Sequence, residues 1–292
     1  MATISTADLT AFEERYSRWL DYSVRERGTI SSALAHSWGA PKVAGRDYVL
    51  MSSVGNPDVF LRAVEGPGAK DFMPMTTWGW NAIEIVADNS RALRQKFLGS
   101  PFNVVGEPQG LNSYPSIVAF QAVGSDQELI YLTAETGDRD QSPLPLPDGD
   151  VGRIFIMVVA GPDIEALLGW YTDKFHLRPG PARQVPIRVV QEAQGLAPDE
   201  LVDIGLSPLT EHGNLIEFDG YSTEHAGPRP ITAGELPPGV SISSFSVADL
   251  DALELRFLSP PANYPGYAYA KGRAATAVGP AGELIELIED GR

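Results

Sequence analysis

The sequence predicts an α+β protein made of four βαβββ modules, which pair into two tandem domains whose curved mixed sheets enclose clefts. A pattern of Leu, Ile, a variable residue and an apolar residue recurs along the chain, as "ELIYL" at 128–132, "NLIEF" at 214–218 and "ELIEL" at 283–287. Each copy follows a strand-like run, an Asp-containing turn and a helix-like run. The repeated unit is therefore a complete supersecondary structure.

The four modules follow one another along the chain. The first contains "TADLTAFEERYSRWL" (6–20) and the second "IEIVADNSRALRQKFLGSP" (83–101). The third contains "IFIMVVAGPDIEALLGWYTDKFHLRPG" (154–180), in which Asp163 is the candidate helix N-cap, and the fourth contains "SFSVADLDALELRFLSPP" (244–261). Apolar residues at helical spacing after a capping residue predict a helix in every module.

The first and third modules share a helix-like insertion, at 30–51 and 187–206, that the other two lack. This alternation indicates a two-module domain that was duplicated, with domains at 1–134 and 151–292. A charged, Pro-rich segment at 135–150 has no periodicity and is the predicted linker. We expect the two modules of each half to pair their sheets around a cleft, with the variable residue of each repeated strand facing that cleft.

Composition restricts the function. The chain has 292 residues, 43% of them hydrophobic, no Cys, and a net charge of −16. This charge disfavours nucleic acid and anionic membranes as partners, and the lack of Cys excludes disulfides and thiolate chemistry. Without a signal-like N-terminus or a long apolar run, we expect a cytoplasmic monomer or homodimer that binds a small-molecule substrate.

The repeat, with V-x-D-L before the helix and G-x-L-I-E-L at the last strand, resembles the vicinal oxygen chelate superfamily, which includes glyoxalase I, extradiol dioxygenases and bleomycin-resistance proteins. The most specific segments are "PAGELIELIED" and "EHGNLIEFDGY". The four-module arrangement is similar to that of the extradiol dioxygenases. The resemblance implies a divalent metal held by a first-strand ligand and a last-strand Glu from each of two modules.

The residues depart from that metal-binding pattern. Glu217 and Glu286 match the last-strand ligand, but the first-strand positions hold other residue types: Asn81 or Ala82, Phe155, and Ile242 or Ser243. The four histidines lie outside the predicted first strands: His36, His176, His212 and His225. Two carboxylates without imidazole or thiolate make a poor Zn²⁺ or Fe²⁺ site. We therefore expect no metal and no other cofactor.

The C-terminal half contains the first group of candidate site residues. Glu217 and Glu286 occupy equivalent positions and are predicted to face one cleft, where close like charges would give an acid beside a base. Tyr267 and Tyr269, predicted to lie on one side of a strand, and Arg273 are candidate substrate-binding residues. In the alternative interpretation, the carboxylates are hydrogen-bonded structural groups and the tyrosines only pack on the sheet.

The N-terminal half contains the second group. Strand alternation places Trp80 and Glu84 on one face, while Arg62 and Tyr131 occupy the last-strand positions. We take Glu84 as a candidate catalytic residue and the other three as candidate substrate-binding residues. In the alternative interpretation, Glu84 forms a buried ion pair with an Arg that only stabilises the sheet.

The function that these residues favour is a metal-independent enzyme acting on a small apolar, aromatic or carbonyl-bearing metabolite. Its chemistry would be proton transfer of the isomerase or lyase type, with Glu as base and Tyr or Arg polarising an oxygen. Two alternatives stay open. One is a non-catalytic binding protein similar to bleomycin-resistance proteins, and the other is a metal-dependent dioxygenase-like or glyoxalase-like enzyme with atypical ligands.

Overall fold

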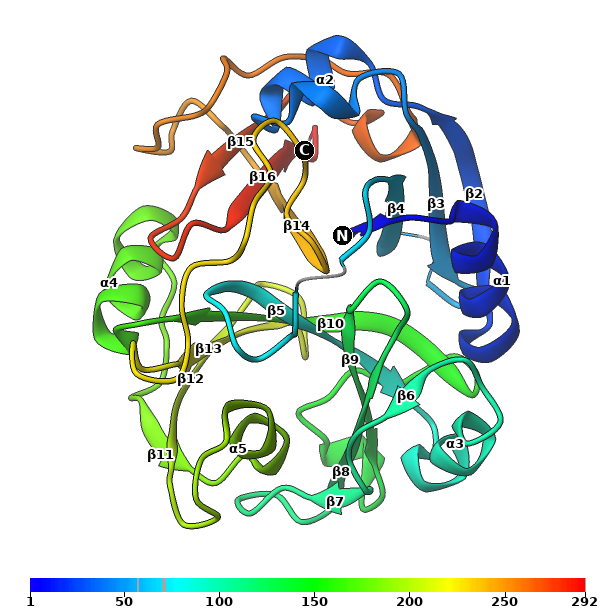
Figure 1. The fold of residues 1–292 in the computed structure, drawn as a ribbon, viewed down its shortest axis with the longest axis vertical. Helices are drawn as coiled ribbons and strands as arrows, with labels where there is room; N and C mark the ends of the chain where they lie inside the picture. The colour runs from blue at the N-terminus through cyan, green and yellow to red at the C-terminus, as the bar shows by residue number, and fades with distance from the viewer. Residues whose placement is uncertain (57, 70–71, 292) are drawn as a thin grey trace.

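The structure is a computed structural model that describes residues 1–56, 58–69 and 72–291. Two curved mixed sheets lie beside each other with helices around them (Figure 1). The largest hydrophobic cluster joins the two sheets, since it contains Ile4 and Leu61 from one and Ile83 and Ile130 from the other. No helix within the described ranges is long and apolar enough to cross a membrane.

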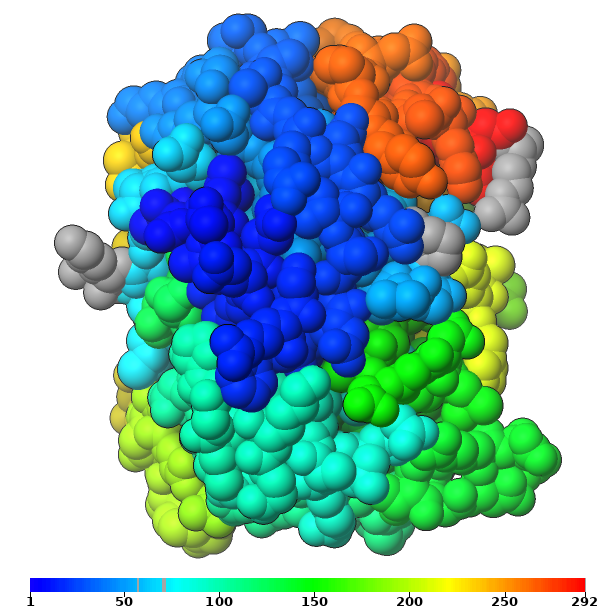
Figure 2. Space-filling view, turned by 90° about the vertical axis from the view of Figure 1, so that its right-hand side faces the viewer, coloured from blue at the N-terminus to red at the C-terminus, as the bar shows by residue number. Residues whose placement is uncertain are grey.

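The first sheet combines strands of the first and fourth modules. Its order is β15(Ala274–Val278), β16(Leu284–Glu289), β14(Val240–Val247), β1(Ala2–Thr6), β4(Phe60–Glu65), β3(Asp47–Ser53) and β2(Tyr22–Thr29). The two modules meet where β1 pairs antiparallel with β14. Figure 2 shows the same proximity at the surface, where first-module residues in blue lie against fourth-module residues in orange.

The second sheet combines strands of the second and third modules. Its order is β11(Arg183–Val185), β12(Val202–Pro208), β13(Leu215–Gly220), β10(Val151–Gly161), β5(Gly79–Ala87), β9(Leu129–Glu135), β8(Ile117–Val123) and β6(Asn103–Val104), with β7(Gln109–Gly110) paired to β8. The modules meet at the antiparallel pair of β5 and β10.

The prediction that each half pairs its own two modules is therefore wrong. The first module pairs with the fourth and the second with the third. Every module leaves a free edge on its first strand, and any of these edges offers the same backbone groups to any other. Local sequence does not choose between them. The residue boundaries of the two halves stay a prediction.

Three modules carry the predicted helix, which packs into the main core: α1(Leu9–Leu20), α3(Ser90–Phe97) and α4(Ile164–Phe175). Each begins with a side-chain cap, from Asp8, Asn89 and Asp163, whose oxygen accepts a hydrogen bond from the amide three residues on. This satisfies one of the free N–H groups of the first helical turn. The N-cap predicted at Asp163 is confirmed.

The fourth module lacks its predicted helix, because residues 248–260 form turns and irregular extended structure. Leu253, Leu255 and Phe257 pack partly buried against the main core, and Phe257 forms an isolated bridge with Ala277 of β15. These apolar residues alternate with Glu and Arg, which is the period of a strand rather than a helix. The alternation favours extended structure here, whereas the similarity to the second module predicts a helix.

The two insertions form the short helices α2(Ser32–Ser37) and α5(Arg188–Gln194), and short 3-10 helices lie at η1(Pro41–Val43), η2(Arg139–Gln141) and η3(Tyr267–Tyr269). Leu34 of α2 packs in a cluster with Ile242 of the first sheet. Val189 and Val190 of α5 pack with Val158 of the second sheet. Each insertion therefore covers the face of its sheet opposite the main core.

The repeated L-I-x-L strands have the predicted alternation. Ile130 and Leu132 point into the main core, as do Ile285 and Leu287. The variable residue between them belongs to the opposite face, so Tyr131 packs in a different cluster. This confirms that the variable residues Arg62, Tyr131, Glu217 and Glu286 share the cleft-side face of their sheets.

The Glu that opens two of the repeats joins neighbouring modules. Glu128 accepts a hydrogen bond from Tyr16 of α1 at 3.3 Å, and Glu283 accepts one from Tyr171 of α4 at 2.8 Å. Burial raises the pKa of both carboxyls to about 7. Each helix is thereby attached to the last hairpin of the next module, which links the two modules within each half.

Cleavage of the predicted linker is expected to leave two fragments that stay associated. Residues 136–141 are exposed, so a protease reaches them, whereas both central strand pairs and the main core join the two halves. Limited proteolysis should give two bands on a denaturing gel but one peak at the parent elution volume in native size exclusion. Separate elution of the two fragments would contradict the sheet pairing.

Candidate functional site

Each sheet has one cleft-side face where the last-strand residues of its two modules meet. In the first sheet these residues are Arg62 and Glu286, which form an ion pair at 3.2 Å. In the second sheet they are Tyr131 and Glu217, on β9 and β13. The prediction that Glu217 and Glu286 face one cleft is therefore wrong, because their modules pair with different partners.

The cleft of the first sheet is closed around Glu286, which is 1% exposed. Its Oε1 accepts hydrogen bonds from Trp38 Nε1 and Tyr269 OH, both at 2.7 Å. Its Oε2 accepts one from Ser244 Oγ at 2.6 Å and one from Arg62 Nη2 at 3.2 Å. Burial opposes the charge, but Arg62 and the three neutral donors outweigh it and lower the pKa of Glu286.

Arg62 is equally enclosed. Its guanidinium lies 4.4 Å from the centre of the Trp38 ring, donates to Thr3 Oγ1 at 3.0 Å and also donates to Tyr269 OH. A cavity of only about 10 Å³ remains beside it, enough for about one water molecule. With every lone pair of Glu286 engaged, this cluster fits a structural ion pair rather than a base or a metal ligand.

Among the other C-terminal candidates, Tyr269 contacts a cleft carboxylate, that of Glu286, whereas Tyr267 and Arg273 lie elsewhere. Tyr267 and Tyr269 belong to a 3-10 helix after the turn at Gly266, not to a strand, so they point in different directions. Tyr267 is 54% exposed and packs edge-on against Phe60, while Tyr269 points inward. The predicted shared strand face is wrong. Arg273 pairs with Glu289 and Asp251 at the surface.

Trp80 does not share a face with Glu84. The register between β5 and β10 shifts between the pairs Ala82–Val158 and Trp80–Val159, so the strict alternation used to place Trp80 fails there. Its indole donates to the carbonyl of Leu284 at 2.8 Å and it packs in the main core near Phe245. Trp80 therefore joins the two sheets, and its predicted place on the cleft-side face is wrong.

The cleft of the second sheet brings three buried acids onto one face. Glu84 lies on β5 beside Tyr131 of β9, and Glu217 and Asp219 lie two residues apart on β13. One strand, β10, separates β5 from β13, and Glu84 and Glu217 lie opposite Ile156 and Val158 of that strand, so their backbones are about 12 Å apart. The side chains of β10 between them are apolar and offer no hydrogen bond.

These acids have few hydrogen-bond donors. Thr133 Oγ1 donates to Glu84 at 2.9 Å, and Tyr221 OH donates to Asp219 Oδ2 at 2.9 Å. Asp219 Oδ1 is buried without a hydrogen-bond partner among the described residues. Within the same ranges, no side chain or backbone amide donates to Glu217, and no ion pair reaches any of the three acids. Glu286 of the first sheet, by contrast, accepts four hydrogen bonds.

Burial and mutual repulsion raise the pKa of all three carboxyls. Burial raises the pKa of Glu84 to about 7 against a hydrogen bond from Thr133, and the charge of Asp219 adds to it. Burial raises the pKa of Asp219 to about 7 as well. For Glu217, burial and the charges of both neighbours raise the pKa well above its ordinary value. Near neutral pH the cluster therefore contains a protonated and an ionised carboxyl together.

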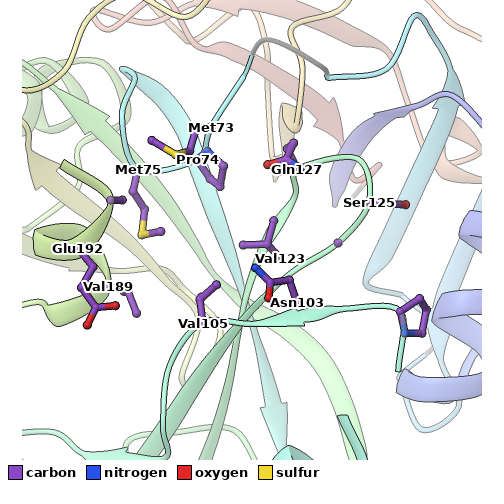
Figure 3. A pocket seen from close by; sticks show the side chains of 13 residues that line it. Met73, Pro74, Met75, Asn103, Val105, Val123, Ser125, Gln127, Val189 and Glu192 are labelled. Atoms are coloured by element: carbon purple, nitrogen blue, oxygen red, sulfur yellow. The ribbon is translucent and has the colours of Figure 1, made fainter. Parts of the chain in front are cut away.

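A cavity of about 490 Å³ opens on the same side of this sheet. As Figure 3 shows, it lies between α5, the loop at 73–75 and the end of β8. None of the three acids lines it. Met75, Val123 and Val189 line it, however, and they pack in the same hydrophobic cluster as Ala82 and Val158. Ala82 precedes Glu84 on its strand face, and Val158 pairs with Glu217.

Neither cleft provides a set of side chains suited to a metal ion. The described ranges contain no group of three or more His, Cys, Asp or Glu side chains placed to hold one. Glu286 already accepts four hydrogen bonds, and the acids of the second sheet have no imidazole beside them. These oxygen-only, widely spaced donors do not fit the transition-metal site that the resemblance implies.

The site predicted from the sequence does not include three residues of the second cleft: Asp219, Tyr221 and Thr133. The first two had a signal, because Glu217, Asp219 and Tyr221 alternate in "NLIEFDGY" and so share one strand face. Thr133 stands two residues after Tyr131 by the same rule. The sequence holds no such signal for the loops that line the cavity, since their position depends on how the modules pair.

The comparisons with known proteins bear on the fold. No family model matches the sequence, and no curated protein does. Glyoxalase I from Zea mays is similar in structure, with a TM-score of 0.65 and 14% identity over 99% of this chain and 91% of that one. A putative dioxygenase from Bacillus subtilis gives 0.56 and 9% over 100% and 84%. Together with the four βαβββ modules and their two cleft-forming sheets, these likenesses show that the chain has the fold of the vicinal oxygen chelate superfamily.

Proposed function

We propose that the protein is a metal-independent enzyme that uses the cleft of the second sheet for proton transfer, of the isomerase or lyase type. Its substrate is a small, largely apolar metabolite that carries a carbonyl group. One observation carries the proposal: buried carboxyls with few hydrogen-bond donors lie on the sheet face whose hydrophobic cluster also lines an apolar cavity. The equivalent carboxyl of the other sheet is neutralised and enclosed.

The roles follow from the protonation states. A base works best when its pKa is near the operating pH, and burial raises the pKa of Glu84 to about 7. Ionised Glu84 removes a proton from carbon next to the substrate carbonyl. Protonated Glu217, whose pKa is raised further, donates a hydrogen bond to the carbonyl oxygen as negative charge develops there. Tyr131, beside Glu84 on the neighbouring strand, is the second donor.

The cavity sets the size and polarity of the substrate. Its volume of about 490 Å³ lies in the range of small-molecule sites. Met73, Met75 and Val105 give it apolar walls, while Asn103 and Gln127 offer a few polar groups. Flexible Met side chains adapt to ligands of irregular shape. The apolar body of the substrate occupies this cavity and its carbonyl end reaches the acids.

A binding protein without chemistry is the second candidate. It is favoured by the lining of the cavity, which is mostly apolar and includes none of the three acids. In that case the acids would not take part in any reaction, and a ligand would leave chemically unchanged.

Replacing either acid by its amide separates the two functions. Glu84→Gln and Glu217→Gln keep the side-chain volume but remove the charge and the basicity. We expect each to lower turnover by about a hundredfold, with a much smaller change in ligand affinity. Carbonyl compounds that raise the melting temperature provide the substrate for this measurement. The exposed Glu165 on α4 gives the matched control, since Glu165→Gln should keep the parent turnover. Full activity in both cleft variants would rule out the proton-transfer proposal.

A further inference from the structure

The backbone of Met75, in the wall of the cavity, is strained. Four non-glycine residues in the described ranges have a φ in the left-handed region, and two of them, Asp21 and His176, end helices, where this conformation is common. The other two, Met75 at 66° and Gln127 at 60°, both line the cavity of the second sheet. Glycine adopts this conformation freely, whereas a longer side chain disfavours it. Backbone strain that the surrounding structure maintains is typical of ligand sites.

Two side chains from different modules hold Met75 in this conformation. Its N–H donates to Asn81 Oδ1 at 2.9 Å, and its carbonyl accepts a hydrogen bond from Gln194 Nε2 at 2.7 Å. Asn81 is buried and is itself fixed, because its Nδ2 donates to the carbonyls of Thr77 and Gly79. Asn81 lies on β5, and Gln194 is the last residue of α5. Met75 is therefore fixed both to the second sheet and to the helix that lines the cavity.

Met75 is the adaptable side chain in the buried part of the cavity. Met75, Val123 and Val189 line this part, since each is at most 9% exposed, whereas Met73 is 51% exposed at the rim. Val123 on β8 and Val189 on α5 are β-branched and have few rotamers. Met75 is unbranched and flexible, and Figure 3 shows its side chain running from the loop toward the side where Val105 and Val189 lie. The volume open to a ligand here therefore depends on Met75.

We infer that Met75 is the specificity-determining residue of this cavity. Its side chain limits the size of the apolar body of the ligand, and Asn81 and Gln194 are positioning residues that act through it. The ligand is a neutral carbonyl compound: among the described residues that line the cavity none is Lys or Arg, and Glu192 is exposed and paired with Arg188. The inference rests on the proposed function in that it concerns the same cavity, but it is tested by binding and does not require turnover.

Two ketones of different size test the role of Met75: acetophenone and 2-acetylnaphthalene. Met75→Ala and Met75→Gly add the volume of the lost side chain to the cavity. In calorimetry we expect the ratio of the two Kd values to shift toward 2-acetylnaphthalene by about tenfold in each variant, relative to the parent. Alanine keeps the strained backbone and glycine relieves it, so an equal shift in both assigns the effect to the side chain.

Met157 gives the matched control, because it has the same side chain and the same exposure of 5% but lies in the main core. Met157→Ala should lower stability and leave the ratio of the two Kd values unchanged. The parent ratio in either Met75 variant, or no binding of either ketone to the parent and the variants, would overturn the inference.

The positioning role of Gln194 is tested by a double-variant cycle. Gln194→Met keeps the length of the side chain but removes the donor, so the ratio should move in the same direction as in Met75→Ala, by a smaller factor. Gln194→Lys still donates and should keep the parent ratio. In the Met75→Ala background, Gln194→Met should have no further effect, because the side chain that it positions is gone. A shift of equal size in both backgrounds would contradict this role.

This inference and the proton-transfer proposal fail in different ways. A changed ketone ratio in the Met75 variants, together with full turnover in Glu84→Gln and Glu217→Gln, supports the role of Met75 and contradicts proton transfer. Loss of turnover in Glu84→Gln, together with the parent ketone ratio in Met75→Ala and Met75→Gly, supports proton transfer and contradicts the role of Met75.

Discussion

Replacing Arg62 with Met is expected to lower the free energy of unfolding by about 3–5 kcal/mol, because it leaves the charge of Glu286 buried without a cation. Met keeps the length of the side chain, so the change removes charge more than packing. Both partners of the pair are at most 2% exposed, so water cannot replace the guanidinium. Urea unfolding followed by tryptophan fluorescence measures the effect directly.

Two controls separate charge from packing. Adding Glu286→Gln to Arg62→Met removes the unpaired charge while an amide still accepts hydrogen bonds from Trp38 and Tyr269, so the double variant should recover most of the lost stability. Arg273→Met breaks an ion pair at the surface, where side chains are partly exposed, and should cost much less. Parent stability in Arg62→Met would show that the pair does not hold this cleft closed.

The second large effect is a pH dependence of stability that Glu84 causes. Its carboxyl has an ordinary pKa of 4.5 in the unfolded chain and about 7 in the folded one. Between these values the folded state binds more protons, so protonation stabilises it. The contribution is complete below about pH 4.5 and is lost as pH rises through 7. A pKa difference of about 2.5 corresponds to about 3 kcal/mol.

Comparison with Glu84→Gln isolates this contribution, because other carboxyls with raised pKa, such as Glu128 and Glu283, are present in both proteins. Relative to the parent, the variant should gain about 3 kcal/mol between pH 4.5 and 8. Urea unfolding across this range measures it, with Glu165→Gln as the baseline for a carboxylate removed from the surface. Parallel stability curves for the parent and Glu84→Gln would mean that Glu84 ionises normally.

Glu286 and Glu217 occupy the same last-strand position in their modules, but their surroundings shift the pKa in opposite directions. Glu286 receives a guanidinium and three neutral donors, so its pKa is lowered although it is buried. Glu217 receives none of these among the described residues, so burial and its neighbours raise its pKa. The same last-strand position therefore holds a structural ion pair in one sheet and a candidate acid in the other. The difference comes from the residue that the paired module brings.

The sequence by itself determined what depends on short-range rules. The period of two in "NLIEFDGY" places Glu217, Asp219 and Tyr221 on one face, and a capping Asp begins the helix after 163. The repeat identified four modules and the fold. These features depend on neighbouring residues alone, so they can be read before the chain is folded.

Only the tertiary structure decided which modules pair, and with them which residues meet. The free edges of four first strands are equivalent in hydrogen bonding, and the choice among them depends on contacts between residues far apart in the sequence, such as Ala2 with Ser243 and Ala82 with Val158. That choice separated Glu217 from Glu286 and joined Arg62 to the latter. It also set the local register shift that turned Trp80 into the core, and it gave the second cleft three acids that no Lys or Arg of the described residues pairs with.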